Sequence, residues 1–263
     1  MSLFGTFEPG LAAYLRYCAV FLVRYFGIAG TIYAVLYVGL RTRATRWRIQ
    51  PGFPGRAEIR HEIWWSMTCM VCTGMTTMLL YALVRDGHTR MYFDVARHGR
   101  AYFAFSVLLG LVVYDAWFYW QHRLLHTPWW FRHVHAVHHR ITNPTPFANF
   151  CLHPVETVMG AACFIVFVVV VPVHPLALAL VSMAIFGWGM IAHLGYEFYP
   201  RGFTRHRVAR WLNTATFHNM HHRRVGTNYG SIFNVWDRLM GTDDPAYQRT
   251  FDAVAARVEP ARP

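Results

Sequence analysis

The stretch HRLLHTPWWFRHVHAVHH, residues 122 to 139, holds six histidines within eighteen residues and directly follows a strongly apolar segment. His122 and His126 are spaced i, i+4, which places both imidazoles on one face of a helix that continues the apolar segment. The run HAVHH adds three more at i, i+3, i+4, again on one face. Imidazoles one helical turn apart can bind the same metal ion. The stretch therefore predicts a metal site at the end of an apolar helix.

A second run with the same spacing, HNMHH, holds His218, His221 and His222. The two triplets and the first pair together supply eight nitrogen donors. This number exceeds the four ligands of a structural zinc site, so we predict two metal ions. Imidazole suits zinc, copper, iron and nickel, so the residue type does not select the metal. Five other histidines are predicted to be ordinary hydrogen-bonded residues: His61, His88, His98, His174 and His206.

The composition is typical of a membrane protein. Of the 263 residues, 55% are hydrophobic and 17% aromatic, while only 14% are charged. All 25 basic residues are arginines that flank apolar segments, so we attribute the formal net charge of +12 to membrane topology and exclude nucleic-acid binding. The five cysteines lie in apolar surroundings, which argues against a secreted disulfide framework and favours simple packing for the C-x-x-C pair Cys69 and Cys72.

Five apolar stretches predict an all-α integral membrane fold with about four transmembrane helices, since about 20 apolar residues span a bilayer as a helix. The stretches are residues 17 to 40, 64 to 84, 102 to 120, 158 to 171 and 176 to 192. PVHP separates the last two, and the fourth is short for a full crossing. We expect this pair to form a tight re-entrant hairpin. The N-terminus lacks the basic region and cleavage site of a secretory signal, so the first helix is expected to stay in the protein.

The distribution of arginine predicts the orientation. Residues 41 to 60 carry six arginines and one glutamate, whereas residues 1 to 15 carry no arginine, so the first helix should run from outside into the cytoplasm. The third helix then delivers His122 to the cytoplasmic face, where we expect a helical, histidine-rich cap. The loop 85 to 100, with four arginines and two aspartates, departs from this rule. Exclusive use of arginine is typical of a GC-rich genome, and we expect a bacterial inner membrane.

Four motifs carry a family resemblance: DAWFYWQHRLLH (115 to 126), HAVHHRITNPTPFANFCLHPVE (135 to 156), HLGYEFYP (193 to 200) and FHNMHHRRVGTNYGSIFNVWDRLMGTDD (217 to 244). In order and spacing they resemble the fatty acid hydroxylase and sterol desaturase superfamily of integral-membrane non-haem di-iron oxidases. TPFA followed by HPVE is similar to the sterol C5 desaturase branch. HLGYEFYP is similar to the C4-methylsterol oxidase and sterol hydroxylase branch, so the substrate stays open.

We expect one structural domain with three regions. Residues 1–100 should form the N-terminal transmembrane helices and their connecting loops. The resemblance implies a fatty acid hydroxylase-like catalytic region in residues 101–245. A C-terminal tail is expected in residues 246–263.

The resemblance implies nine metal ligands: His122, His126, His135, His138, His139, His193, His218, His221 and His222. Glu197 stands where some members have a further histidine, and its carboxylate could ligate metal or hold a ligand in place. His153 is expected to hold a ligand in place or to have a structural role rather than to bind metal. Asp115 lies seven residues before His122, on nearly the same helical face. An ionisable residue inside a membrane is usually functional, and we expect Asp115 to accept the N–H of a ligand imidazole.

The resemblance also implies two iron ions and O2 as co-substrate, with zinc able to replace iron in purified protein. The expected reaction is hydroxylation or desaturation of a C–H bond in a sterol-like, fatty acyl or aminolipid substrate. The sequence shows no H-P-G-G haem motif, no G-x-G-x-x-G fingerprint and no ferredoxin cysteine set. We therefore expect a separate ferredoxin, cytochrome b5-like protein or reductase as electron donor. Four arginines form a candidate dock, although membrane sidedness alone also accounts for them: Arg201, Arg205, Arg207 and Arg210.

Two other classes of function fit a membrane-bound histidine site. A metal-dependent membrane lipid hydrolase would use metal-bound water to attack an ester and would consume no O2. A membrane metal transporter would distribute ionisable residues through several spans, whereas here the histidines lie beyond the helices.

Overall fold

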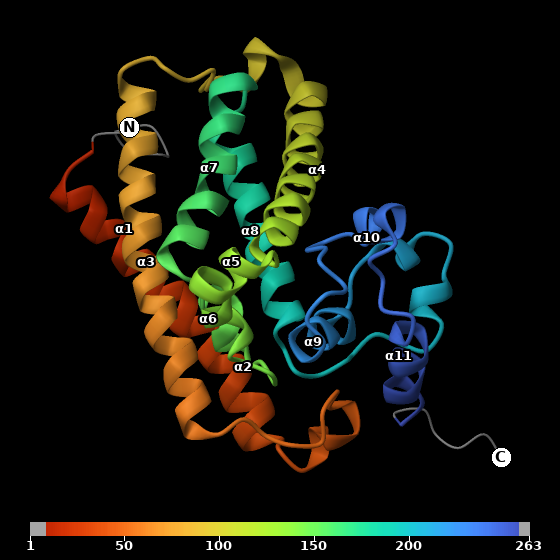
Figure 1. The fold of residues 1–263 in the computed structure, drawn as a ribbon. Coiled ribbons are helices and arrows are strands. Elements are labelled where there is room, and N and C mark those ends of the chain that lie inside the picture. The colour runs from red at the N-terminus through yellow and green to blue at the C-terminus, as the bar shows by residue number, and fades with distance from the viewer. Residues whose placement is uncertain (1–8, 258–263) are drawn as a thin grey trace.

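The computed structural model describes residues 9–257, and in this part of the chain the secondary structure is helical apart from three isolated β-bridges. Long helices stand side by side, and a set of short helices packs beside their lower ends (Figure 1). This arrangement confirms the predicted all-α membrane fold with a helical, histidine-rich cap.

Four helices are long and apolar enough to cross a bilayer: Leu11–Gly39, α3 (Arg56–Arg85), α4 (Gly99–Leu125) and α8 (Pro175–Ala192). The first contains α1 (Leu11–Tyr25) and α2 (Thr31–Tyr33), which wider π-helical turns join. Large apolar side chains point outward from these helices, and Val23, Trp64 and Leu108 are 63–74% exposed. Such a surface suits contact with lipid. The chain is a multi-pass membrane protein, as predicted.

The predicted hairpin is formed by α7 (Pro154–Val170) and α8. Each of these helices begins with proline, and the preceding histidine, His153 or His174, accepts a backbone N–H two residues ahead at 3.2 or 3.1 Å. The turn between the helices contacts the loop before α4, where the Tyr92 N–H donates to the Val173 carbonyl at 3.2 Å. The turn of the hairpin therefore lies as far from the histidines as the start of α4 does. The short apolar stretch that forms α7 had suggested a shallower hairpin.

Helices α4 and α8 pack closely at Gly110. A β-carbon at this position would lie 2.8 Å from a methyl carbon of Val181. A small residue at such a contact lets two membrane helices approach each other. Because both helices end at histidines, this contact helps to fix the relative positions of His122 and His193.

The cap contains α5 (Pro128–Trp130), α6 (Ala136–His139), α9 (Ala215–Arg223), α10 (Val235–Met240) and α11 (Tyr247–Ala256). Phe251 of α11 and Phe217 of α9 are fully buried in one apolar cluster. The predicted C-terminal tail therefore contains a packed helix, because α11 has an apolar face that covers α9. Residues 1–8 and 258–263, which belong to the predicted N-terminal region and tail, lie outside the described residues.

Candidate metal centre

The structure brings together the nine histidines that the sequence predicted as ligands. One group consists of His122, His126, His135, His139 and His221, and the other of His138, His193, His218 and His222. Within each group, one nitrogen from every imidazole lies within 4.8 Å of the others. Eight of the nine residues are buried, and His126 is partly buried. Each group could hold a metal ion with nitrogen ligands.

Each histidine triplet contributes to both groups. In HAVHH the first and last histidines belong to one group and His138 to the other. In HNMHH, His221 is separated from His218 and His222 in the same way. Residues at i and i+4 therefore share a group, whereas adjacent histidines, which point about 100° apart on a helix, do not. Residues 122 to 139 thus supply four ligands of one group and one of the other, rather than a self-contained half of the centre.

Helix ends position these side chains. His122 lies in the last turn of α4, and His126 is the first residue beyond that helix. His193 occupies the equivalent position after α8. Helix α9 begins where the Thr214 hydroxyl accepts the Phe217 N–H at 3.2 Å. The point at which each helix starts or stops therefore sets the direction in which its histidines point.

Backbone carbonyls fix the tautomer of five imidazoles. The Nδ1–H groups donate to the carbonyls of other residues at 2.7–3.1 Å: His122 to Tyr229, His138 to Cys151, His193 to Gly189, His221 to Thr227 and His222 to Ile141. A carbonyl oxygen can only accept, so the proton lies on Nδ1 in each case. The Nε2 lone pair is then free to bind a metal ion.

Several Nε2 atoms face one another or have no partner. The Nε2 atoms of His122 and His135 are 3.0 Å apart, and those of His193 and His218 are 2.9 Å apart. Three further imidazoles hold buried nitrogens without a hydrogen-bond partner: His126, His139 and His221. Buried polar atoms in proteins are nearly always paired. Metal ions between these lone pairs would satisfy them, so the donor set fits two cations.

Burial keeps these imidazoles neutral. It lowers the pKa of His138 to about 4 and the pKa values of His193 and His221 to about 3. Burial and the neighbouring imidazoles also lower the pKa values of His218 and His222 well below the usual range. Because neutral imidazole is the form that ligates metal, the two groups are ready for metal at neutral pH.

Glu156 is a site residue that sequence reasoning missed. Its carboxylate accepts the Nδ1–H of His135 at 3.0 Å, and both side chains are buried. A carboxylate behind an imidazole orients the ring and makes it a stronger ligand. The signal was present in HPVE, where an acid stands in the first turn of an apolar helix, but the sequence did not show which imidazole it meets.

Asp115 does not accept a hydrogen bond from a ligand imidazole, contrary to the prediction. Its carboxylate accepts the backbone N–H groups of Ile232 and Phe233 at 2.9 and 3.0 Å. Seven residues are about two helical turns, or roughly 10 Å, so Asp115 lies too far along α4 from His122. It instead anchors the loop whose Tyr229 carbonyl accepts the His122 N–H.

Glu197 and His153 lie outside both groups of nitrogens. The Glu197 carboxylate accepts the backbone N–H groups of Tyr199 and Thr216 at 3.1 and 3.0 Å, which ties it to the start of α9. The His153 ring accepts the Val155 N–H and caps α7. The Glu197 carboxylate therefore positions the start of α9, and it is not among the groups that could hold a metal ion. His153 belongs to neither group of nitrogens, and its ring caps α7.

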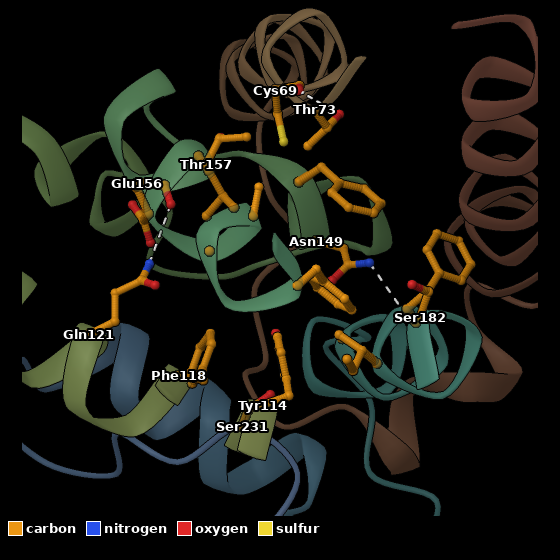
Figure 2. Close-up of a pocket in the computed structure, with 18 of the residues that line it drawn as sticks. Cys69, Thr73, Tyr114, Phe118, Gln121, Asn149, Glu156, Thr157, Ser182 and Ser231 are labelled. Carbon is orange, nitrogen blue, oxygen red and sulfur yellow. Dashed lines mark hydrogen bonds between the residues drawn. The ribbon is translucent and has the colours of Figure 1, made fainter. Parts of the chain in front are cut away.

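A cavity of about 390 Å³ lies between α3, α4, α7 and α8 (Figure 2). Some of the nine clustered histidines border it. Five of the nine form part of its wall: His122, His135, His138, His193 and His218. Tyr114 and Phe118 of α4 lie across the cavity from Cys69 and Thr73 of α3 (Figure 2). The wall is mostly apolar and aromatic. Such a cavity among membrane helices suits a lipid chain or ring.

The fold and these nitrogens define an integral membrane protein whose buried histidines could hold two metal ions. The fatty acid hydroxylase family model matches residues 107–242, which include all nine histidines. The chain belongs to this family, and the resemblance predicted from the histidine motifs is confirmed.

Curated relatives of this chain carry the names of sterol enzymes. A Delta(7)-sterol 5(6)-desaturase of Gibberella zeae is 28% identical over 185 residues, which cover 70% of this chain and 56% of the relative. A lathosterol oxidase of Rattus norvegicus is 27% identical over 187 residues, covering 70% and 61%. A probable Delta(7)-sterol 5(6)-desaturase of Neurospora crassa is 32% identical over 168 residues, covering 64% and 46%. The chain thus spans about half to three fifths of the length of these relatives. No solved structure matches it.

Proposed function

We propose that this protein is a membrane-bound non-haem di-iron oxidase that uses O2 and external electrons to hydroxylate or desaturate a C–H bond of a lipid. One observation carries the proposal: two groups of buried imidazoles, with Nε2 lone pairs that lack hydrogen-bond donors, border an apolar cavity between membrane helices. Family membership and the names of the relatives support an oxidoreductase that acts on lipids.

The nine clustered histidines would hold the two iron ions, one ion in each group. Bound iron would supply the activation of O2 that removal of hydrogen from an unactivated C–H bond requires. Zinc can occupy the same nitrogen ligands in purified protein.

The rest of the chain would position the lipid and the ligands. Apolar residues such as Phe118, Phe164 and Ile165 line the cavity, and they would hold a lipid against the histidine end and exclude water. Glu156 and the five backbone carbonyls keep the imidazoles oriented with Nε2 toward the metal ions. A C–H bond that enters this end of the cavity would lie next to the metal centre.

The names of the relatives and the apolar cavity support a lipid substrate. Sterol-like lipids are favoured by the names of the relatives, and fatty acyl chains and aminolipids also fit an apolar cavity. Arginine usage and distribution favour a bacterial inner membrane with the metal centre on the cytoplasmic side. The relatives named above come from fungi and a mammal and lend no support to a bacterial origin.

A separate ferredoxin, cytochrome b5-like protein or reductase would supply the electrons. The candidate dock remains the arginine cluster beside the cap. Within it, Arg205 forms an ion pair with Asp252, and the Arg210 guanidinium lies 4.8 Å from the centre of the Trp211 ring. Arg207 is exposed. An acidic face on the donor would complement it.

The proposal is tested by O2 uptake together with mass spectrometry of lipids. Iron-loaded protein in lipid nanodiscs, supplied with electrons and a total lipid extract, should consume O2 and yield a lipid that gains one oxygen atom or loses two hydrogen atoms. His221→Ala should lose this activity and part of its metal, while its insertion into the membrane is unchanged. Ester cleavage without O2 uptake would instead establish the hydrolase. The absence of both O2 uptake and ester cleavage would refute the oxidase.

A further inference from the structure

The cavity wall contains one charge far from the metal centre. Arg24 lines the cavity from the first membrane helix, thirteen residues after Leu11 and fifteen before Gly39. At a rise of about 1.5 Å per residue, it lies roughly 20 Å from either end of that helix. From this depth the Arg24 side chain is too short to bring its guanidinium to the membrane surface. An ionisable residue at this position is costly and is usually functional.

The contacts of Arg24 do not balance its charge. Its guanidinium carbon lies 4.6 Å from the centre of the Phe186 ring, and Nη1 lies 3.9 Å from the Met183 sulfur. Its Nε atom is buried without a hydrogen-bond partner. No carboxylate among residues 9–257 forms an ion pair with it. A partly desolvated cation that lacks an anion is unfavourable, so the arrangement favours an anionic ligand.

Four other polar residues along the wall are already engaged within the protein. The hydroxyls of Thr73, Thr76 and Thr77 donate to carbonyls of their own helix at 2.7–3.1 Å. The amide of Asn149 donates to the Phe186 carbonyl at 3.5 Å. Arg24 therefore differs from these residues, because it retains an unused donor and a full charge.

We propose that Arg24 binds the anionic end group of the lipid substrate, a carboxylate or a comparable anion, and so selects an acidic lipid. This inference rests on the proposed function, because it assigns a substrate class to the same cavity. The guanidinium can donate two parallel hydrogen bonds to the two oxygens of a carboxylate. A neutral hydroxyl group has a single oxygen and cannot accept this pair of bonds.

The distance to the histidines sets which part of such a lipid is oxidised. Phe186 and Met183 lie seven and ten residues before His193 on α8, which corresponds to roughly 10–15 Å along the helix. A lipid whose anionic group lies at Arg24 would therefore present a carbon about this far from the group to the metal centre. The reacting C–H bond is remote from the acid rather than next to it.

Ligand binding by the full-length protein in nanodiscs tests the proposal without turnover. The probes are two radiolabelled pairs that differ in charge: oleate with oleyl alcohol, and cholesteryl hemisuccinate with cholesterol. The wild-type protein should bind the anionic member of at least one pair about tenfold more tightly than the neutral member. The pair that shows the preference identifies an acyl chain or a polycyclic ring system as the lipid body.

Variants identify the residue responsible. Arg24→Gln should abolish the preference, and Arg24→Lys should keep part of it. The matched control is Arg16→Gln, on the exposed surface of the same helix, which should bind like the wild type. Equal affinity for both members of each pair in the wild type would overturn the proposal whether or not the variants fold, as would a preference that survives in Arg24→Gln. Because binding needs neither O2 nor electrons, correct binding without lipid oxidation would refute only the proposed function.

Discussion

At the scale of single residues, hydrogen bonds behind the imidazoles prepare the metal centre. Backbone carbonyls hold the proton on Nδ1 in five rings, and the Glu156 carboxylate does so for His135. Each ring therefore presents a lone pair inward before any metal binds. Because the rings are already oriented, they need little rearrangement when a metal ion binds.

Replacement of Glu156 should weaken metal binding without unfolding the protein. In Glu156→Gln the His135 ring loses its anionic partner, so metal affinity should fall by roughly tenfold or more. Metal retained after dialysis against graded chelator, measured by elemental mass spectrometry, reports the change. Asp86→Asn, in an exposed ion pair with Arg85 far from the centre, should retain metal like the wild type. Equal retention by both variants would show that Glu156 does not support the site.

The metal-free protein should lose stability as pH falls. The pKa values of His138, His193 and His221 are lowered to about 4, 3 and 3, whereas an unfolded imidazole titrates near 6.5. Below about pH 6.5 the unfolded chain binds protons that the folded chain does not, so unfolding is favoured increasingly down to about pH 4. Thermal unfolding of chelator-treated protein should show a lower midpoint at about pH 5.5 than at about pH 7.5. A midpoint that stays constant or rises would contradict this assignment.

At the scale of elements, the hydropathy of the chain located the membrane helices, and proline with a histidine cap defined where α7 and α8 begin. The depth of the α7–α8 hairpin was not visible in hydropathy. It is shown by contacts between segments that are distant in sequence, such as the hydrogen bond between Tyr92 and Val173. Close packing of α4 against α8 at Gly110 likewise needs a partner that the sequence does not identify.

Gly110→Val should therefore destabilise the helix bundle. The new side chain would overlap Val181 across the contact, and such overpacking typically costs about 1–3 kcal/mol. The thermal unfolding midpoint in detergent should fall, and metal content should fall with it because α4 and α8 carry ligands. Gly187→Val, where a β-carbon meets no atom within 4 Å, is the control and should change the midpoint little. If the two variants had the same midpoint, the close contact would not contribute to stability.

At the scale of the whole molecule, three segments far apart in the sequence converge on a membrane cavity: residues 122 to 139, His193, and residues 218 to 222. The cap carries the arginines Arg201, Arg205, Arg207 and Arg210. This arrangement would allow lipid to reach the centre from the bilayer and electrons to reach it through the cap.

Charge reversal on the cap should impair only the delivery of electrons. With all four arginines changed to glutamate, turnover with the physiological donor should fall severalfold and lose its dependence on salt, because attraction to an acidic partner is removed. Turnover with a small chemical reductant should stay near the wild-type rate. Unaltered turnover with the physiological donor would remove the docking surface from consideration.

The sequence by itself determined the membrane helices and the nine clustered histidines, because hydropathy and helical spacing are local properties that a linear chain displays. It could not determine how the histidines divide. His138 and His139 are adjacent, as are His221 and His222, yet the members of each pair serve different groups. The sequence also did not reveal the hydrogen bond between Glu156 and His135, and it predicted the wrong hydrogen-bond partner for Asp115. Those assignments depend on which face of each helix packs inward and which distant carbonyl or amide lies opposite, and only the tertiary structure decides both.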